Sequence, residues 1–173
     1  MRVLEEGDLR IEIPDDVQSV EKFDDHGSHG LSHCMKAVDF IIETDSHIWF
    51  IEIKDPDHPQ AREKDRQRFL RDLQSSELDR DLVQKFRDSF LYRWAEDRIT
   101  KPIRYYIIIA SNQLDEALLL SRIDALKQKL PLTGPRSGRW KRRLVEGCGI
   151  YNLRTWKGAF PEFPLSRISG RIS

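Results

Sequence analysis

Two apolar runs that enclose acidic and basic side chains constrain the fold of this chain more than any other feature. Residues 38–43 and 48–54 are rich in Val, Ile, Phe and Trp, which are common in β-strands. The polar residues 44–47 between them are typical of a short turn. The segment therefore predicts a β-hairpin, and its internal Asp, Glu and Lys need an explanation because buried strands seldom carry unpaired charges.

The even number of residues in the turn determines which side chains of the hairpin face each other. Glu43 is expected opposite Ile48, and the same register places Asp39 directly opposite Glu52. Side chains alternate along a strand, so Lys54 shares the face of Glu52 and the intervening apolar residues point to the other face. Opposed side chains have Cβ atoms about 4.5–5.5 Å apart, a separation that a divalent cation can bridge. We therefore expect one face to hold the charged groups and the other to pack in the core.

The spacing of these charged residues resembles the active-site hairpin of a known nuclease superfamily. Asp39, twelve intervening residues and then Glu52-Ile53-Lys54 at the end of an apolar strand are similar to the motif of the PD-(D/E)XK nuclease superfamily, which has the restriction-endonuclease-like fold. The resemblance implies that Asp39 and Glu52 bind Mg²⁺, or Mn²⁺ as a substitute, with the backbone carbonyl of Ile53 as a further candidate ligand. It also implies that Lys54 positions the attacking water or stabilises developing negative charge.

The resemblance extends to two side chains outside the hairpin. Related nucleases often take one more metal-binding Glu from the helix before the hairpin, and Glu21 is the best match by position. They also often place a Lys on the helix after the hairpin, near the scissile phosphate, which makes Lys85 a candidate. The alternatives are an exposed helix acid and a lysine that only lies along an apolar stripe. A further strand expected before the Asp-bearing strand would have to come from residues 29–35 or 9–13.

The remaining pattern predicts an α/β fold, with a mixed central β-sheet flanked by helices, in one domain of residues 1–173. The expected strands are residues 9–13, 103–109 and 149–153, and the expected helices are residues 15–24, 60–98 with a break near 75–76, and 114–130. The run 103–109 should be central, and 149–153 should return parallel to it because a helix separates the two strands. The aromatic and proline-rich tail, residues 154–173, is expected to cap the core.

The composition is that of a globular protein without a membrane partner. Of 173 residues, 39% are hydrophobic and 34% are charged. No apolar run approaches the ~20 residues of a membrane span, and the first residues lack the apolar stretch of a signal peptide. We therefore expect a cytoplasmic protein in which Cys34 and Cys148 are free thiols.

The charge is balanced overall but unevenly distributed along the chain. Residues 1–100 carry 15 Lys and Arg against 24 Asp and Glu, whereas residues 101–173 carry 14 against 5. The basic part could contact phosphates, and its densest cluster contains five cations. These candidate nucleic-acid-binding residues are Arg136, Arg139, Lys141, Arg142 and Arg143. The alternative is a solvated loop without a ligand.

These features lead to a metal-dependent phosphodiesterase, an endonuclease or exonuclease that hydrolyses nucleic acid, as the first functional hypothesis. DNA is preferred over RNA as the partner because the sequence has no aromatic-studded RNA-binding motif. The alternative is a catalytically inactive nuclease-like module that binds nucleic acid or supports an assembly. A zinc site in the histidine-rich loop 26–33 is a third reading, but its spacing fits no compact ligand pattern. The sequence leaves a homodimer open.

Overall fold

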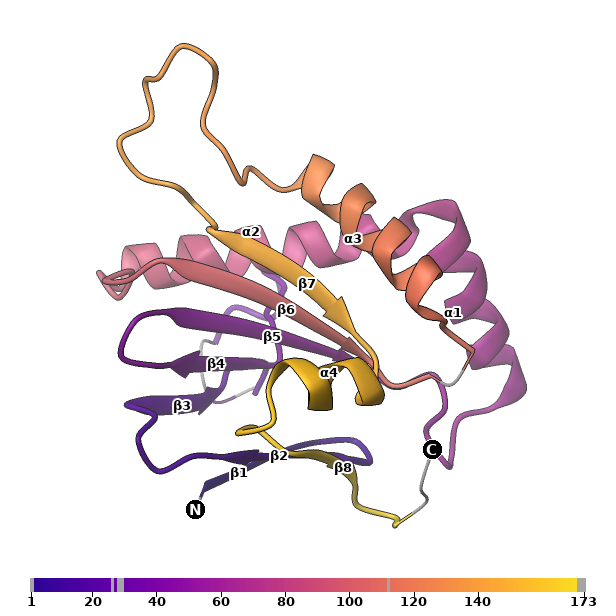
Figure 1. Cartoon of the computed structure of the whole chain (residues 1–173). Helices are drawn as coiled ribbons and strands as arrows, with labels where there is room; N and C mark the ends of the chain where they lie inside the picture. The colour runs from indigo at the N-terminus through magenta and orange to yellow at the C-terminus, as the bar shows by residue number, and fades with distance from the viewer. Residues whose placement is uncertain (1, 26, 28–29, 112, 171–173) are drawn as a thin grey trace.

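The chain folds into three layers around a five-stranded sheet (Figure 1), as seen in a computed structural model that describes residues 2–25, 27, 30–111 and 113–170. The strands are β1 (Arg2–Glu6), β2 (Leu9–Ile13), β3 (Ser19–Lys22), β4 (Phe40–Glu43), β5 (Ile48–Lys54), β6 (Ile103–Ile109), β7 (Gly147–Tyr151) and β8 (Leu165–Arg167). The helices are α1 (Glu63–Ser75), α2 (Glu77–Ala95), α3 (Glu116–Lys129) and α4 (Leu153–Ala159). The expected α/β class and mixed sheet are confirmed.

The main sheet has the strand order β3-β4-β5-β6-β7. Its first three strands are antiparallel, and β5, β6 and β7 are parallel to one another. The parallel pairs are joined through α1 and α2 and then through α3, as the alternation of apolar runs and helical stripes predicted. The internal position of residues 103–109, the parallel return of the next strand and the helix break at Ser76 are confirmed.

The expected helix at residues 15–24 is wrong, because this segment contributes the edge strand β3. Val20 pairs with Ile42 and Lys22 pairs with Phe40 in an antiparallel ladder with β4. Val17 and Phe23, which a helix would place on one stripe, pack in different cores on opposite sides of the sheet. Pairing with β4 has therefore outweighed the local helical pattern. No strand forms within the described part of residues 29–35.

Both faces of the main sheet are buried, which corrects the expectation of one charged face and one core face. On one face the side chains of β4, β5 and β6 pack against α1, α2 and α3, with Phe50, Phe86 and Tyr105 in the centre. On the other face they pack against α4 and a second sheet of order β1-β2-β8 (Figure 1). The charged residues of the hairpin therefore occupy the edge of a core.

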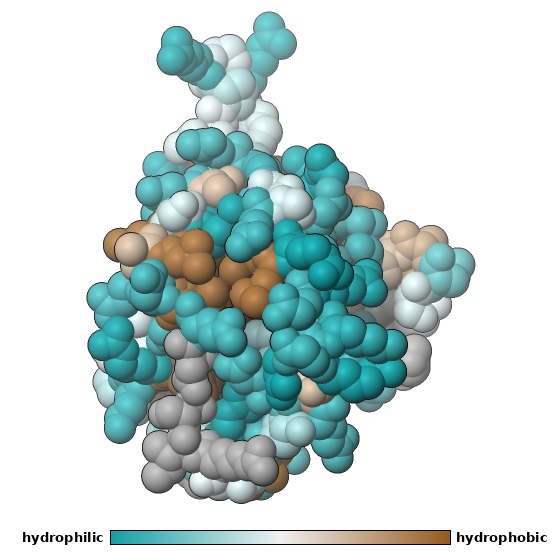
Figure 2. Space-filling view, turned by 90° about the vertical axis from the view of Figure 1, so that its right-hand side faces the viewer, coloured by the Kyte–Doolittle hydropathy of each residue, from teal (hydrophilic) through white to brown (hydrophobic). Residues whose placement is uncertain are grey.

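The tail, residues 154–173, was expected to cap the core. Its Trp156 and Phe163 are instead members of the apolar core between the main sheet and the second sheet. Trp156 of α4 is fully buried, and its Nε1 donates a hydrogen bond of 2.8 Å to the backbone oxygen of Phe163. Residues 165–167 then pair antiparallel with β2. The chain between α3 and β7 projects from the body (Figure 1), with hydrophilic side chains at its tip (Figure 2). No helix in the described ranges is long and apolar enough to cross a membrane.

Arg167 at the end of β8 joins the second sheet to the main sheet. Its guanidinium donates two hydrogen bonds of 3.0 Å to Asp55, one of 3.3 Å to Asp8 and one of 3.1 Å to the backbone oxygen of Ala110. All three charged side chains are nearly buried. Asp55 directly follows Lys54, so this contact also fixes the end of the hairpin.

Replacing Arg167 by Ala is expected to lower the free energy of unfolding by about 3 kcal/mol, because the buried Asp55 carboxylate loses its cation. Urea denaturation measures this change. The control is Arg154→Ala, since Arg154 pairs with Glu116 on the exposed surface and such pairs contribute under about 1 kcal/mol. Equal losses in the two variants would show that the Arg167 contacts are no more stabilising than a surface pair.

Candidate active site

The hairpin formed by β4 and β5 has the predicted register. Glu43 pairs with Ile48 and Phe40 pairs with Ile51, so Asp39, immediately before β4, faces Glu52. The Oδ2 atom of Asp39 accepts a hydrogen bond of 2.5 Å from the backbone N–H of Ile53. This hydrogen bond lies just beyond the last backbone pair between β4 and β5, and it holds the Asp39 side chain against β5. The predicted juxtaposition of the two carboxylates is therefore confirmed.

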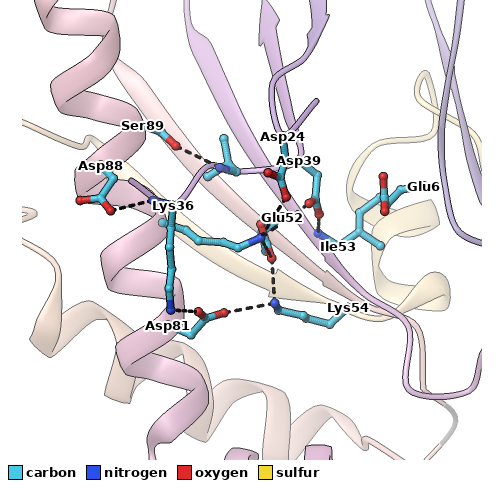
Figure 3. Close-up of polar contacts among 12 residues, drawn as sticks. Glu6, Asp24, Lys36, Asp39, Glu52, Ile53, Lys54, Asp81, Asp88 and Ser89 are labelled. Carbon is cyan, nitrogen blue, oxygen red and sulfur yellow. Dashed lines mark hydrogen bonds and ion pairs between the residues drawn. The ribbon is translucent and has the colours of Figure 1, made fainter. Parts of the chain in front are cut away.

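Glu52 is completely buried, although a carboxylate in this position needs compensating charge. Its Oε1 atom lies 2.9 Å from Nζ of Lys54 (Figure 3). The same oxygen lies 2.8 Å from Nζ of Lys85. Its Oε2 atom has no hydrogen-bond partner among the residues that the structure describes. Lys54 thus shares the face of Glu52 as expected, and one buried carboxylate oxygen is left unsatisfied.

Lys85 enters the site from α2 and lies between the two acids of the hairpin. Its Nζ atom is 3.7 Å from Oδ1 of Asp39 and 3.8 Å from Oδ2 of Asp24, in addition to its contact with Glu52. The resemblance had suggested this lysine as a candidate, and the structure places it beside the carboxylate pair. Its ammonium group occupies the position from which a metal ion could contact both Asp39 and Glu52.

Asp81, Lys36 and Asp24 also lie at the site, and the sequence analysis did not single them out. Oδ2 of Asp81 is 3.2 Å from Nζ of Lys54, and its Oδ1 is 2.7 Å from Nζ of Lys36 (Figure 3). Asp81 and Lys85 are four residues apart and share one face of α2. This polar pair beside the apolar stripe was the available signal for Asp81.

The site balances two crowded carboxylates with two ammonium groups. Burial and the charge of Glu52 raise the pKa of Asp39 to about 7. Burial by itself would lower the pKa of Lys54, but Glu52 and Asp81 raise it above its usual value. The pKa of Lys85 is likewise raised by Glu52 and Asp39 in spite of burial. Both lysines are therefore cations at neutral pH, whereas Asp39 is partly protonated when no metal is bound.

The backbone of β5 brings another oxygen toward Asp39. The N–H and C=O groups of one residue in a strand point to the same edge, and the N–H of Ile53 binds Asp39. The Ile53 carbonyl is therefore directed to the same side, as a metal ligand would require. An open hollow of about 490 Å³ between α1 and α2 is lined by Lys54 and Asp81, so these two side chains of the site can be reached from solvent.

The carboxylate pair fits a hard divalent cation that takes its remaining ligands from water or substrate. Mg²⁺ is often held by one or two carboxylates together with substrate phosphate and water. Asp39 and Glu52 supply such oxygens, and the unsatisfied Oε2 of Glu52 is suited to a cation. No group of three or more His, Cys, Asp or Glu within the described ranges could hold a metal by itself. The donors therefore suit Mg²⁺ or Mn²⁺ bound together with a substrate.

Glu21, the expected additional ligand, lies away from the carboxylate pair. It is on β3 opposite Ile41, and it forms ion pairs with Arg93 and, at 3.6 Å, with Arg98. Loss of the predicted helix explains this position, because the strand directs the side chain toward the end of α2. The structure thus places Glu21 in a separate ion-pair network.

The five cations at 136–143 also lie away from the site, on the exposed loop between α3 and β7. In the histidine-rich loop, His26 and His29 fall outside the described residues, and His33 is exposed. Cys34 and Cys148 are free thiols, as expected. The structure therefore brings together only the hairpin residues and Lys85 from the predicted set.

Comparisons with known proteins add no relative. No protein-family model matches the chain, and neither a curated protein nor a solved structure matches it. The geometry and chemistry of the site are therefore the basis for inferring a function.

Proposed function

We propose that the protein is a metal-dependent nuclease that hydrolyses phosphodiester bonds of nucleic acid, with DNA as its substrate. The observation that carries this proposal is the fully buried Glu52, which faces Asp39 and has one oxygen without a hydrogen-bond partner in the described part of the chain. An unsatisfied buried carboxylate oxygen is costly for folding alone. A bound cation would satisfy it.

The residues of the site have distinct roles in this proposal. Asp39 and Glu52 would hold Mg²⁺ together with the Ile53 carbonyl. When bound, the ion would neutralise phosphate charge and lower the pKa of a water molecule. Lys54 is oriented by Glu52 and Asp81 and is accessible from the hollow, so it can donate a hydrogen bond to a phosphate oxygen or to the attacking water.

The strand order supports the resemblance to the PD-(D/E)XK superfamily, because it supplies the strand that the sequence pattern lacked. The resemblance expects an additional strand before the Asp-bearing strand, and β3 at Ser19–Lys22 occupies that place. The helix expected ahead of it is replaced by the β1–β2 hairpin. The order around the site is therefore consistent with this fold, but its first element differs.

A catalytically inactive nuclease-like module that binds nucleic acid or supports an assembly is the second candidate. The position of Lys85 favours it, because an ammonium group already contacts Glu52 and lies near Asp39. A resident cation of this kind neutralises the acids without a metal. The two candidates differ in whether a divalent ion binds at this place.

Divalent metal should both activate cleavage and stabilise the fold. We expect Mg²⁺ or Mn²⁺ to support cleavage of labelled DNA and EDTA to stop it. At a Mn²⁺ concentration about 100 times its dissociation constant, the gain is about 2.7 kcal/mol, which corresponds to a rise in Tm of roughly 5–10 °C. Assays on single-stranded DNA, duplex DNA and RNA, together with thermal melts, measure the two effects.

The matched control for the metal effect is Glu21→Gln. Because Glu21 lies in a separate ion-pair network, this variant should keep the Mn²⁺-dependent rise in Tm, even if its own Tm is lower. A wild-type protein that neither cleaves nucleic acid nor gains stability from Mn²⁺ would favour the non-catalytic module.

A further inference from the structure

The loop between α3 and β7 carries an unusual concentration of positive charge. We call residues 131–145 the arm. The arm contains five cations and no acidic residue. All five are exposed, and none forms an ion pair with any residue that the structure describes. By contrast, Lys54, Lys85, Arg93, Arg122 and Arg167 all contact carboxylates. The arm therefore presents positive charge that the protein itself does not neutralise.

The arm has a defined shape that displays an aromatic ring among these cations. At its tip, the N–H of Gly138 donates a hydrogen bond of 2.9 Å to the oxygen of Pro135, and Gly138 has a φ of 65°. A Cβ atom on Gly134 would lie 2.8 Å from Cβ of Trp140, so the glycine allows the two sides of the arm to approach. Trp140 is 42% exposed. An exposed aromatic ring surrounded by cations is suited to stacking on a base of single-stranded nucleic acid.

The arm and the carboxylate pair lie at different ends of the parallel strands. Gly147, where β7 begins, is paired with Arg104, whereas Glu52 is paired with Ile107, three residues farther along β6. Three residues of strand correspond to about 10 Å. Glu52 on β5 is also two strands away from β7, which adds about 10 Å across the sheet, so Gly147 lies about 14 Å from Glu52. The arm extends away from the start of β7 (Figures 1 and 2) and therefore lies farther from Glu52 than this. A ligand must be extended to contact both places.

A groove on the outer side of α2 lies between the site and the base of the arm. It has a volume of about 630 Å³ and is lined by Arg80, Val83, Gln84, Arg87, Asp88 and Lys129. Asp88 accepts a hydrogen bond of 2.9 Å from the backbone N–H of Lys36 beside the site. Lys129 is the last residue of α3, two residues before the arm begins. Arg80 pairs with Glu77 and Lys129 pairs with Asp79, whereas Arg87 has no ion pair with a described residue. The groove thus offers a path of mixed charge from one place to the other.

We propose that the arm is a second DNA-binding element, which binds the phosphates of a single-stranded segment and stacks Trp140 on one of its bases. The intervening strand follows the α2 groove to Glu52, so DNA long enough to span both places binds more tightly than short DNA. The arm's binding role stands on its own observations, whereas the cleavage of DNA held in this way rests on the proposed function.

The test is fluorescence anisotropy in EDTA with labelled oligothymidylates of 4 and 20 nucleotides. A 4-mer has only three internucleotide phosphates, so it cannot occupy the cations of the arm and also reach the site. The wild-type protein should bind the 20-mer at least 10-fold more tightly than the 4-mer. Combined charge reversal at Arg139, Lys141 and Arg142 should weaken 20-mer binding about 30-fold. It should also reduce the slope of log K against log salt concentration by about 2, since three phosphate contacts are lost.

Two further variants separate stacking and charge. Trp140→Ala should weaken 20-mer binding about 10-fold without changing the salt slope, because it removes stacking but no charge. The matched control reverses three exposed cations elsewhere, Lys64, Arg71 and Lys157, which have no ion pair with a described residue. It changes the net charge equally and should have little effect. Circular dichroism melts confirm that each variant is folded.

The possible failures distinguish the arm proposal from the proposed nuclease activity. Equal losses in the arm and control variants, or equal binding of the two oligonucleotides, would overturn the arm proposal even if Mn²⁺-dependent cleavage occurs. An unchanged affinity of Trp140→Ala would overturn the stacking role. Arm-dependent binding without any metal-dependent cleavage would support the arm and overturn the nuclease.

Discussion

Glu52→Gln should reduce metal-dependent cleavage by about 1,000-fold or more, while DNA binding in EDTA stays within about 2-fold of wild type. The amide retains the size of the side chain but removes the charge that would hold the cation. Binding is preserved because Glu52 is completely buried and cannot form the main contact with DNA. Single-turnover cleavage and anisotropy measure the two effects separately.

The matched control is Glu43→Gln on the same hairpin. Glu43 lies at the opposite end of β4 and pairs with Lys101, so its neutralisation should leave cleavage intact. Retained cleavage in Glu52→Gln, or an equal loss in both variants, would exclude Glu52 as the essential metal ligand. Glu52→Gln, unlike Glu43→Gln, should also lose the Mn²⁺-dependent rise in Tm.

The contacts of Glu52 change the stability that we expect for Glu52→Gln in the absence of metal. From the hairpin register alone, two facing carboxylates should repel, and neutralising one of them should be neutral or slightly stabilising. In the folded protein, however, Glu52 contacts both Lys54 and Lys85. We therefore expect Glu52→Gln to lower the free energy of unfolding of the metal-free protein by about 2 kcal/mol, because both ammonium groups lose a carboxylate.

Lys85→Met should increase the affinity for Mn²⁺ by about 10-fold or more, since a neutral side chain of similar length no longer competes for the carboxylates. The reason is the position of its Nζ atom, 2.8 Å from Oε1 of Glu52 and 3.7 Å from Oδ1 of Asp39. The metal-free protein should lose about 3 kcal/mol of stability, because the two acids then face each other without this cation. Calorimetric titration with Mn²⁺ and thermal melts test both effects.

Lys101→Met provides the matched control for Lys85. Lys101 is similarly shielded from solvent and lies 2.8 Å from Glu43, at the other end of the hairpin. This variant should lose stability without a gain in Mn²⁺ affinity. If neither wild type nor Lys85→Met responds to Mn²⁺, Lys85 is a permanent counter-ion and the non-catalytic module replaces the nuclease.

The hairpin could be predicted from the sequence because its constraints are local. Alternating side chains and an even turn are sufficient to place Asp39 opposite Glu52. The parallel pairing of β5, β6 and β7 also followed from the alternation of strands and helices. These features depend on periodicities within short segments and on the order of elements.

The surroundings of the hairpin depend on contacts between distant segments and were therefore harder to predict. The strand at Ser19–Lys22 forms because β4 offers an open edge, and this displaced the expected helix. Asp24 and Lys36 reach the site from the segment between β3 and β4, and Asp81 reaches it from α2. Their positions follow from how the loop and the helix pack, which no local pattern specifies.

The pairing of β2 with β8 has a consequence for the order of folding during synthesis. The N-terminal hairpin cannot be completed into its three-stranded sheet until residues 165–167 have been made. Until residues 153–167 have been made, the face of the main sheet that carries Phe40, Ile51 and Trp49 lacks α4 and β8 as its cover. A nascent chain that already contains the whole main sheet therefore still exposes apolar surface, and this interval is when the protein is most exposed to aggregation.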